Sequence, residues 1–204
     1  MQGKGEVDRD RISRQRIVIA HGKGGCKSVK TRHIAFIGIL GAAVFSGGWL
    51  FYAAGHMLPV PGGKFIAMTP YVGFAMAIAA VRVGSPWTMT LVALAMGAVA
   101  ALFTPLMSLA IAAAGIAADL TGRLPRRSLS RRIANTVHAA AFPFWGFWSF
   151  TLVSAYLTRN PAYELVRPAH LAAAGAFVAI ASVVGALLGV RFAERFHFLG
   201  GGET

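Results

Sequence analysis

Long uncharged apolar runs, separated by short polar segments, dominate the chain from residue 33 onward. No Lys, Arg, Asp or Glu occurs in residues 33–63, 65–81, 83–118, 133–158 or 168–190. Uncharged apolar runs of about 18 or more residues are typical of transmembrane helices. The pattern therefore predicts an integral membrane protein.

Two of these runs are too long for a single crossing. As one helix, the run 83–118 would reach about 54 Å at about 1.5 Å per residue, whereas the hydrocarbon core is about 30 Å thick. Thr104-Pro105 lies near its middle, and proline disfavours helix at the residue before it. We therefore expect two short helices joined by a tight turn. The run 33–63 ends in HMLPVPGG, whose prolines and glycines predict a loop after about Gly55.

The predicted fold class is an all-α membrane protein, a compact bundle of six transmembrane helices. The expected spans are about 33–54, 65–81, 86–103, 105–120, 133–157 and 168–191. The chain then divides into a basic tail at 1–32, a six-span membrane domain at 33–192 and a C-terminal tail at 193–204.

The Lys and Arg residues predict the orientation of these spans. With the N-terminus inside, three basic residues fall outside, Lys64, Arg159 and Arg167, and the other 17 of the 20 fall inside. Because basic residues concentrate on the cytosolic side of membrane proteins, both termini are expected in the cytosol, and the protein in the plasma or inner membrane. A five-span plan with one long kinked helix would move a basic segment outside, so it is disfavoured.

Composition and charge agree with this plan. Only 13% of the 204 residues are charged, and 56% are hydrophobic, whereas a soluble domain carries about 25% charged residues. The net charge of +13 lies in the tail and between spans, with no basic stripe interleaved with aromatics, so nucleic acid is not an expected partner. The tail is instead expected to contact anionic lipids. Cys26 is the single cysteine, which excludes an internal disulfide.

The tail contains the glycine-rich stretch HGKGGCKS, residues 21–28, which resembles a phosphate loop. A phosphate loop has the spacing G-x-x-x-x-G-K-[ST]. Counting back from Lys27, Cys26 and His21 occupy the two glycine positions. A Cβ at position 26 would crowd the close backbone approach that glycine permits. A nucleotide site is therefore not expected in the tail.

The predicted membrane domain is poor in catalytic groups. Asp119 is the single carboxylate close to a span, and we expect it to be a structural partner of Arg123 or of a helix end rather than a proton carrier. Within the predicted membrane domain, no His-x-x-x-His or Glu-x-x-His pair predicts a metal site. His138 and several serines could form a hydrolase pair, but their spacing selects none. No catalytic residue, metal or cofactor is therefore predicted.

Aromatic and polar residues concentrate toward the outer ends of the predicted spans. A pocket lined by aromatics with a few polar groups is the usual small-ligand site, although an aromatic belt at the membrane interface gives a similar pattern. The candidate ligand-binding residues are His56, Met57, Lys64, Met68, Tyr71, Trp145, Trp148, Tyr163, Arg167 and His170.

Small residues recur every four positions in three spans. These ridges are Gly38, Ala42 and Ser46; Ala93, Gly97 and Ala101; and Ala181, Gly185 and Gly189. Small-x-x-x-small patterns allow close helix contact in lipid. One ridge is expected to face a partner subunit, but periodicity does not select which.

The chain resembles the substrate-binding S component of an energy-coupling factor (ECF) transporter. The resemblance covers roughly residues 31–195 and rests on the first span TRHIAFIGILGAAVFSGGWLF, the outer loop LPVPGGKF, and the basic inner loop and last span. It implies an outward-opening pocket for a vitamin or related micronutrient, and docking on a membrane coupling subunit that carries two ABC-type ATPases. It also implies that the first span docks on the coupling subunit, through Gly38, Ala42 and Ser46 with Ala43 and Gly47 beside them.

Several functions remain open at this point. The aromatic residues suit a flat heteroaromatic vitamin, whereas His56, Met57 and His170 could ligate haem or a metal. A stand-alone carrier would transport without partners, and a membrane enzyme or assembly factor is supported by the lone histidines alone. We expect a non-catalytic S component, with ATP hydrolysed on its partner chains.

Overall fold

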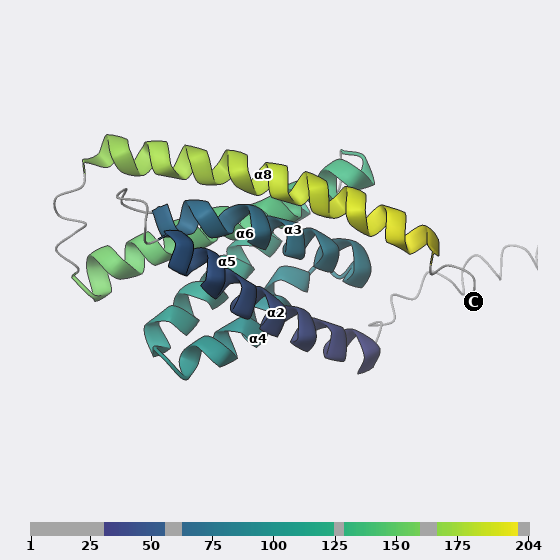
Figure 1. Ribbon diagram of the computed structural model, residues 1–204, viewed down its shortest axis with the longest axis horizontal. Coiled ribbons are helices and arrows are strands. Elements are labelled where there is room, and N and C mark those ends of the chain that lie inside the picture. Colours follow the sequence, from purple (N-terminus) through teal and green to yellow (C-terminus); the bar gives the residue numbers. More distant parts are fainter. Residues whose placement is uncertain (1–30, 56–62, 125–128, 160–166, 200–204) are drawn as a thin grey trace, which may run out of the picture. The chain divides into compact units, whose positions relative to one another are not determined.

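The structure is a computed structural model that describes residues 31–55, 63–124, 129–159 and 167–199 (Figure 1). Helices form nearly all of these residues. The helices are α2 (Thr31–Gly55), α3 (Gly63–Val83), α4 (Thr88–Ala101), α5 (Pro105–Arg123), α6 (Arg131–Leu152) and α8 (Pro168–Leu199), and a π-helical turn, η2 (Val153–Leu157), continues α6. Within these ranges there is no strand. The predicted all-α fold with six helices is confirmed, and the glycine-rich stretch 21–28 lies outside the described residues.

Four of these helices are long and apolar enough to cross a membrane. They are α2, α3, α5 and α8, with apolar segments at Ile34–Gly55, Phe65–Val83, Pro105–Arg123 and Pro168–Phe196. α4 is apolar but has only 14 residues, which is about 21 Å of helix. α6 is long enough but begins with two arginines and is less apolar than the four. Four of the six predicted spans are therefore helices of sufficient length and apolar character to cross a membrane.

The break predicted at Thr104-Pro105 is present. Thr104 has extended backbone angles, φ −151° and ψ 121°, and Pro105 occupies the first turn of α5. Proline is favoured there because its fixed φ suits a helix start and its missing N–H has no helical partner to lose. Two short helices therefore replace the single long one, as the length argument requires.

Small residues make up most of the buried core. On α3 the buried positions include Ala75, Ala77, Ala79 and Ala80, with Met76 among them. Alanine gives little side-chain area to bury, so helix contact here depends on short distances between backbones. The helix pairs α3–α8, α4–α5, α5–α6 and α6–α8 form the main contacts.

The closest approach joins α3 to α8, which lie side by side (Figure 1). A Cβ added at Gly185 would collide with the backbone carbonyl of Pro70, and one at Gly189 with that of Phe74. From the other side, a Cβ at Gly73 would lie 2.7 Å from the Ser182 carbonyl oxygen. The small-residue ridge of the last predicted span therefore packs inside the bundle.

The ridge of the third predicted span is used in the same way. A Cβ at Gly97 would lie 3.2 Å from the Ser108 hydroxyl oxygen on α5. Across the same contact, a Cβ at Gly115 of α5 would collide with the Cβ of Ala93. Ala93 and Gly97 thus serve the contact between α4 and α5, and two of the three ridges are occupied within the chain.

Adding one methyl group at the α3–α8 contact should destabilise the fold. We expect Gly185→Ala to lower the free energy of unfolding by about 1–3 kcal/mol, because the neighbouring atoms are backbone and cannot rotate away. Gly146→Ala on α6 is the matched control, because no heavy atom lies within 4 Å of its added Cβ. Thermal unfolding of the purified protein in detergent measures both, and equal melting temperatures for the two variants would contradict the close packing.

Candidate functional site

The N-terminus of α4 is capped by a residue from another helix. Trp87 stands at the capping position, and no side chain there forms a cap hydrogen bond. Asp119 of α5 fills this role: its carboxylate accepts hydrogen bonds from the backbone N–H groups of Met89, at 3.1 Å, and Thr90, at 2.8 Å. These are the second and third residues of α4, whose N–H groups have no partner within the helix. The Thr90 hydroxyl donates a further bond, 2.6 Å long, to the same carboxylate.

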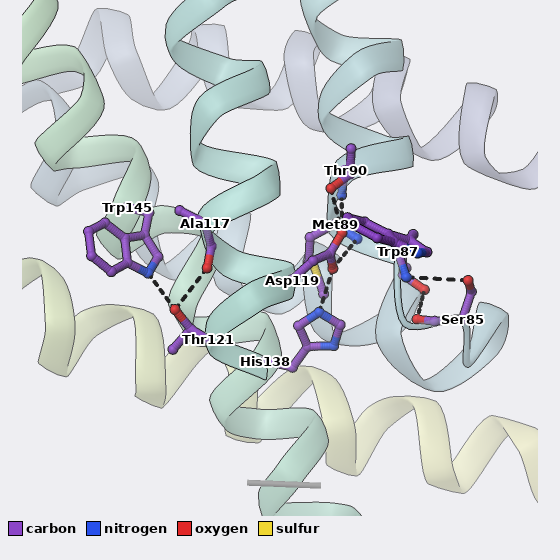
Figure 2. A network of polar contacts seen from close by, with 10 residues as sticks. Ser85, Trp87, Met89, Thr90, Ala117, Asp119, Thr121, His138 and Trp145 are labelled. Carbon is purple, nitrogen blue, oxygen red and sulfur yellow. Dashed lines mark hydrogen bonds and ion pairs between the residues drawn. The ribbon is translucent and has the colours of Figure 1, made fainter. Parts of the chain in front are cut away.

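Figure 2 shows that the same carboxylate also binds α6. The Nε2 atom of His138 lies 2.7 Å from an Asp119 oxygen, and the side chains are 1% and 0% exposed respectively. Space for the imidazole comes from Gly122 on α5, where a Cβ would collide with the ring. One buried carboxylate therefore joins three helices, α4, α5 and α6.

Two further contacts surround this junction. The Arg123 guanidinium lies 4.1 Å from the centre of the Trp87 ring, a cation–π distance. The Trp145 indole N–H donates to the Thr121 hydroxyl at 2.8 Å, which binds α6 to α5 a second time (Figure 2). Of the two partners expected for Asp119, the helix end is the one observed, and Arg123 instead packs on the aromatic ring before α4.

The chemistry of this junction is structural. Four hydrogen-bond donors converge on the Asp119 carboxylate. A membrane-embedded anion requires such partners, because an isolated buried charge is costly. Its negative charge also faces the positive end of the α4 dipole. Within the described ranges, no three His, Cys, Asp or Glu side chains gather into a metal-binding group. We therefore assign Asp119 and His138 to helix anchoring.

One of the predicted ligand-binding residues, Trp148, lies in an aromatic cluster formed by α3, α6 and α8. Phe65 packs edge-on against Phe147 at 6.2 Å between ring centres and lies 5.0 Å from Phe150. Trp148 contacts Phe147 at 5.4 Å, and its ring lies against Gly175 of α8. Trp148 is thus partly buried among aromatic rings, and the cluster residues Phe147 and Phe150 were not among the predicted residues.

Other predicted residues point to different helices. The Tyr71 hydroxyl donates to the Ala43 carbonyl of α2 at 2.8 Å, and its ring stacks on Phe51. Trp145 binds Thr121, as described, and Met68 packs against the main core cluster. Trp145 and Trp148 both contact Phe144, at 5.6 and 6.5 Å between ring centres, whereas Tyr71 contacts α2.

The remaining predicted residues lie near chain segments between helices. Arg167 and His170, at the start of α8, are exposed. Lys64 lies in the first turn of α3, and its side chain is outside the described part of the structure. His56, Met57 and Tyr163 lie outside the described residues altogether. The ligand-binding assignment of this whole set stays a prediction.

The small-residue ridge of α2 differs from the other two because it is exposed. α2 turns Ile37, Gly41, Val44 and Gly48 toward the bundle, and Gly41 approaches Ala95 of α4. The opposite face carries Gly38, Ala42, Ala43 and Ser46, all exposed, and nothing lies within 4 Å of a Cβ added at Gly38. Gly47 lies between these faces, and a Cβ there would collide with the Tyr71 hydroxyl. Gly47 therefore serves the contact with α3.

These features define a class: a small all-α membrane protein whose helices pack through alanine and glycine. No protein-family model matches the sequence, and no curated protein matches it significantly. A solved structure described as the crystal structure of an S-component of an ECF transporter superposes on the chain with a TM-score of 0.60 at 17% sequence identity. The match covers 85% of this chain and 88% of that one. The chain therefore has the S-component fold that its sequence resembles.

Removing the shared carboxylate should loosen three helices at once. We expect Asp119→Ala to reduce the free energy of unfolding by about 3–5 kcal/mol, the usual cost of breaking a buried charged pair from one side. Thr90→Val deletes one of the four hydrogen-bond donors and should lower the free energy of unfolding by about 1 kcal/mol. Thermal unfolding in detergent compares the two variants. Equal melting temperatures for Asp119→Ala and the unmodified protein would contradict the assigned anchoring role.

Proposed function

We propose that this chain is the substrate-binding S component of an ECF-type importer, which captures a small micronutrient from outside and delivers it through an ATP-driven coupling module. The observation that carries the proposal is the S-component fold over 85% of the chain. Its partners are a membrane coupling subunit and two ABC-type ATPases, and the chain itself is non-catalytic. α4 and α6 complete the six crossings, with both termini in the cytosol, in agreement with the distribution of Lys and Arg.

The docking surface for the coupling subunit is the exposed face of α2. All three small-residue ridges have the same spacing, but those of α4 and α8 are occupied inside the bundle. Gly38, Ala42 and Ser46 remain available on the surface of the chain. Because small residues let two helices approach closely in lipid, this ridge suits a partner helix.

The substrate site lies near the aromatic cluster of Phe65, Phe147 and Trp148. Aromatic side chains bind flat ligands through stacking and supply large contact areas at low entropic cost. The polar groups that would orient the ligand are Arg167 and His170, together with Lys64 and the candidates His56, Met57 and Tyr163. A heteroaromatic vitamin is the substrate class that this combination favours.

Bulk added to the α2 face should prevent docking without unfolding the chain. We expect Ala42→Trp to reduce the amount of coupling subunit and ATPases that co-purify with the tagged chain by about tenfold, since overpacking an interface typically costs 1–3 kcal/mol. Ala176→Trp on the exposed face of α8 is the matched control and should leave co-purification unchanged. Equal recovery of partners with both variants would contradict the α2 docking surface.

The optical spectrum distinguishes a vitamin from haem. We expect the protein purified from its native membrane to show no Soret band, and mass spectrometry of the denatured sample to release an aromatic micronutrient. A ligand that stacks on Trp148 should be retained less by Trp148→Ala. A Soret band that disappears in the His170→Ala variant would identify haem, rather than a vitamin, as the bound ligand, since imidazole is a common axial ligand of haem iron.

A further inference from the structure

Three arginines from two helices surround one surface depression. Arg132 near the start of α6, with Arg191 and Arg195 near the end of α8, lines a volume of about 360 Å³. Among the described residues, the remaining lining residue is Glu194, whose carboxylate lies 3.6 Å from the Arg132 guanidinium. One carboxylate does not neutralise three guanidinium groups, so the depression keeps an excess of positive charge.

The helix geometry adds to this positive potential. The depression lies beside the first turn of α6, and Ser130 at its capping position forms no side-chain cap hydrogen bond. The N-terminal end of a 22-residue helix carries a partial positive charge and N–H groups that favour anions. Arginines also bind phosphate oxygens in paired hydrogen bonds, which makes a phosphate group the best complement to this set.

An exposed apolar stripe leads along α8 directly to the arginines. Ile180, Val184 and Leu188 are spaced four apart, and Arg191 and Arg195 continue the same helix face three and seven residues later. Each of the three apolar side chains is at least half exposed, with values of 64%, 50% and 54%. The stripe and the basic depression are therefore continuous.

The length of the stripe matches half a bilayer. Ile180 and Arg191 are 11 residues apart, which is about 16 Å along a helix. One leaflet contributes about half of a hydrocarbon core that is about 30 Å thick. An acyl chain lying on the stripe would thus place its headgroup at the arginines, whereas a free phosphate ion would leave the stripe unused.

We propose that Arg132, Arg191 and Arg195 form a binding site for the phosphate headgroup of an anionic phospholipid, whose acyl chain lies along Ile180, Val184 and Leu188 of α8. The site is separate from the α2 face and from the aromatic cluster. It does not depend on the substrate or on the coupling module. Binding there would hold the end of α8 against the start of α6 through a bridging phosphate.

Native mass spectrometry of the purified full-length chain tests this site. The probes are phosphatidylglycerol, which is anionic, and phosphatidylcholine, which has the same acyl chains but no net charge. We expect preferential retention of phosphatidylglycerol, and a loss of about tenfold in that retention for Arg191→Gln combined with Arg195→Gln. Glu194→Gln should increase retention, because it removes the one negative charge that lines the depression.

Arg131→Gln provides the matched control, because Arg131 is exposed on the same turn of α6 but does not line the depression. It should retain phosphatidylglycerol as the unmodified protein does, and the melting temperatures of all variants should agree. Equal loss in Arg131→Gln, or no loss in the double variant, would overturn the site. Displacement of the lipid by millimolar inorganic phosphate would also overturn it, because the acyl chain should give the lipid a large advantage.

Discussion

Close contact between helix backbones is the constraint on which this structure depends. Lipid solvates apolar side chains as well as a protein core does, so burial alone gives transmembrane helices little reason to associate. The core of this chain is accordingly rich in alanine, and glycines mark the tightest crossings, Gly185 against Pro70 and Gly115 against Ala93. Because α8 uses its small residues on α3, and α4 uses its own on α5, the α2 ridge is the one of the three that stays exposed. This difference in packing supports the proposal that the α2 ridge is the docking surface.

The second constraint is the polar end of a short helix. α4 begins without a side-chain cap of its own, and in a bilayer unpaired N–H groups are costly. Asp119 satisfies two of them and draws His138 to the same point, which binds α4, α5 and α6 into one unit. α2 is joined to the rest by other contacts, such as the Tyr71 bond to Ala43 and the stacking of Phe45 on Phe103. The Asp119 junction and the contacts of α2 are therefore two separate sets of interactions within one bundle.

The sequence predicted the helices because their signals are local. Charge-free runs give the spans, and Thr104-Pro105 divides the run that is too long for one crossing. Contacts between distant segments lack such signals. Asp119 was expected to partner a helix end, but the sequence does not show that this end is the start of α4, 30 residues away at Met89. Nor does it single out Thr90 as a hydrogen-bond donor to Asp119. Periodicity could not rank three ridges of equal spacing, because their use depends on which helices become neighbours.

An S component binds its ligand but does not transport it alone. The decisive measurement is therefore uptake of the ligand released from the purified protein, in proteoliposomes with and without the coupling subunit and ATPases. We expect binding but negligible accumulation with the chain alone, and ATP-dependent uptake once the partner chains are added. Efficient uptake by the chain alone would contradict the proposed function and identify a stand-alone carrier.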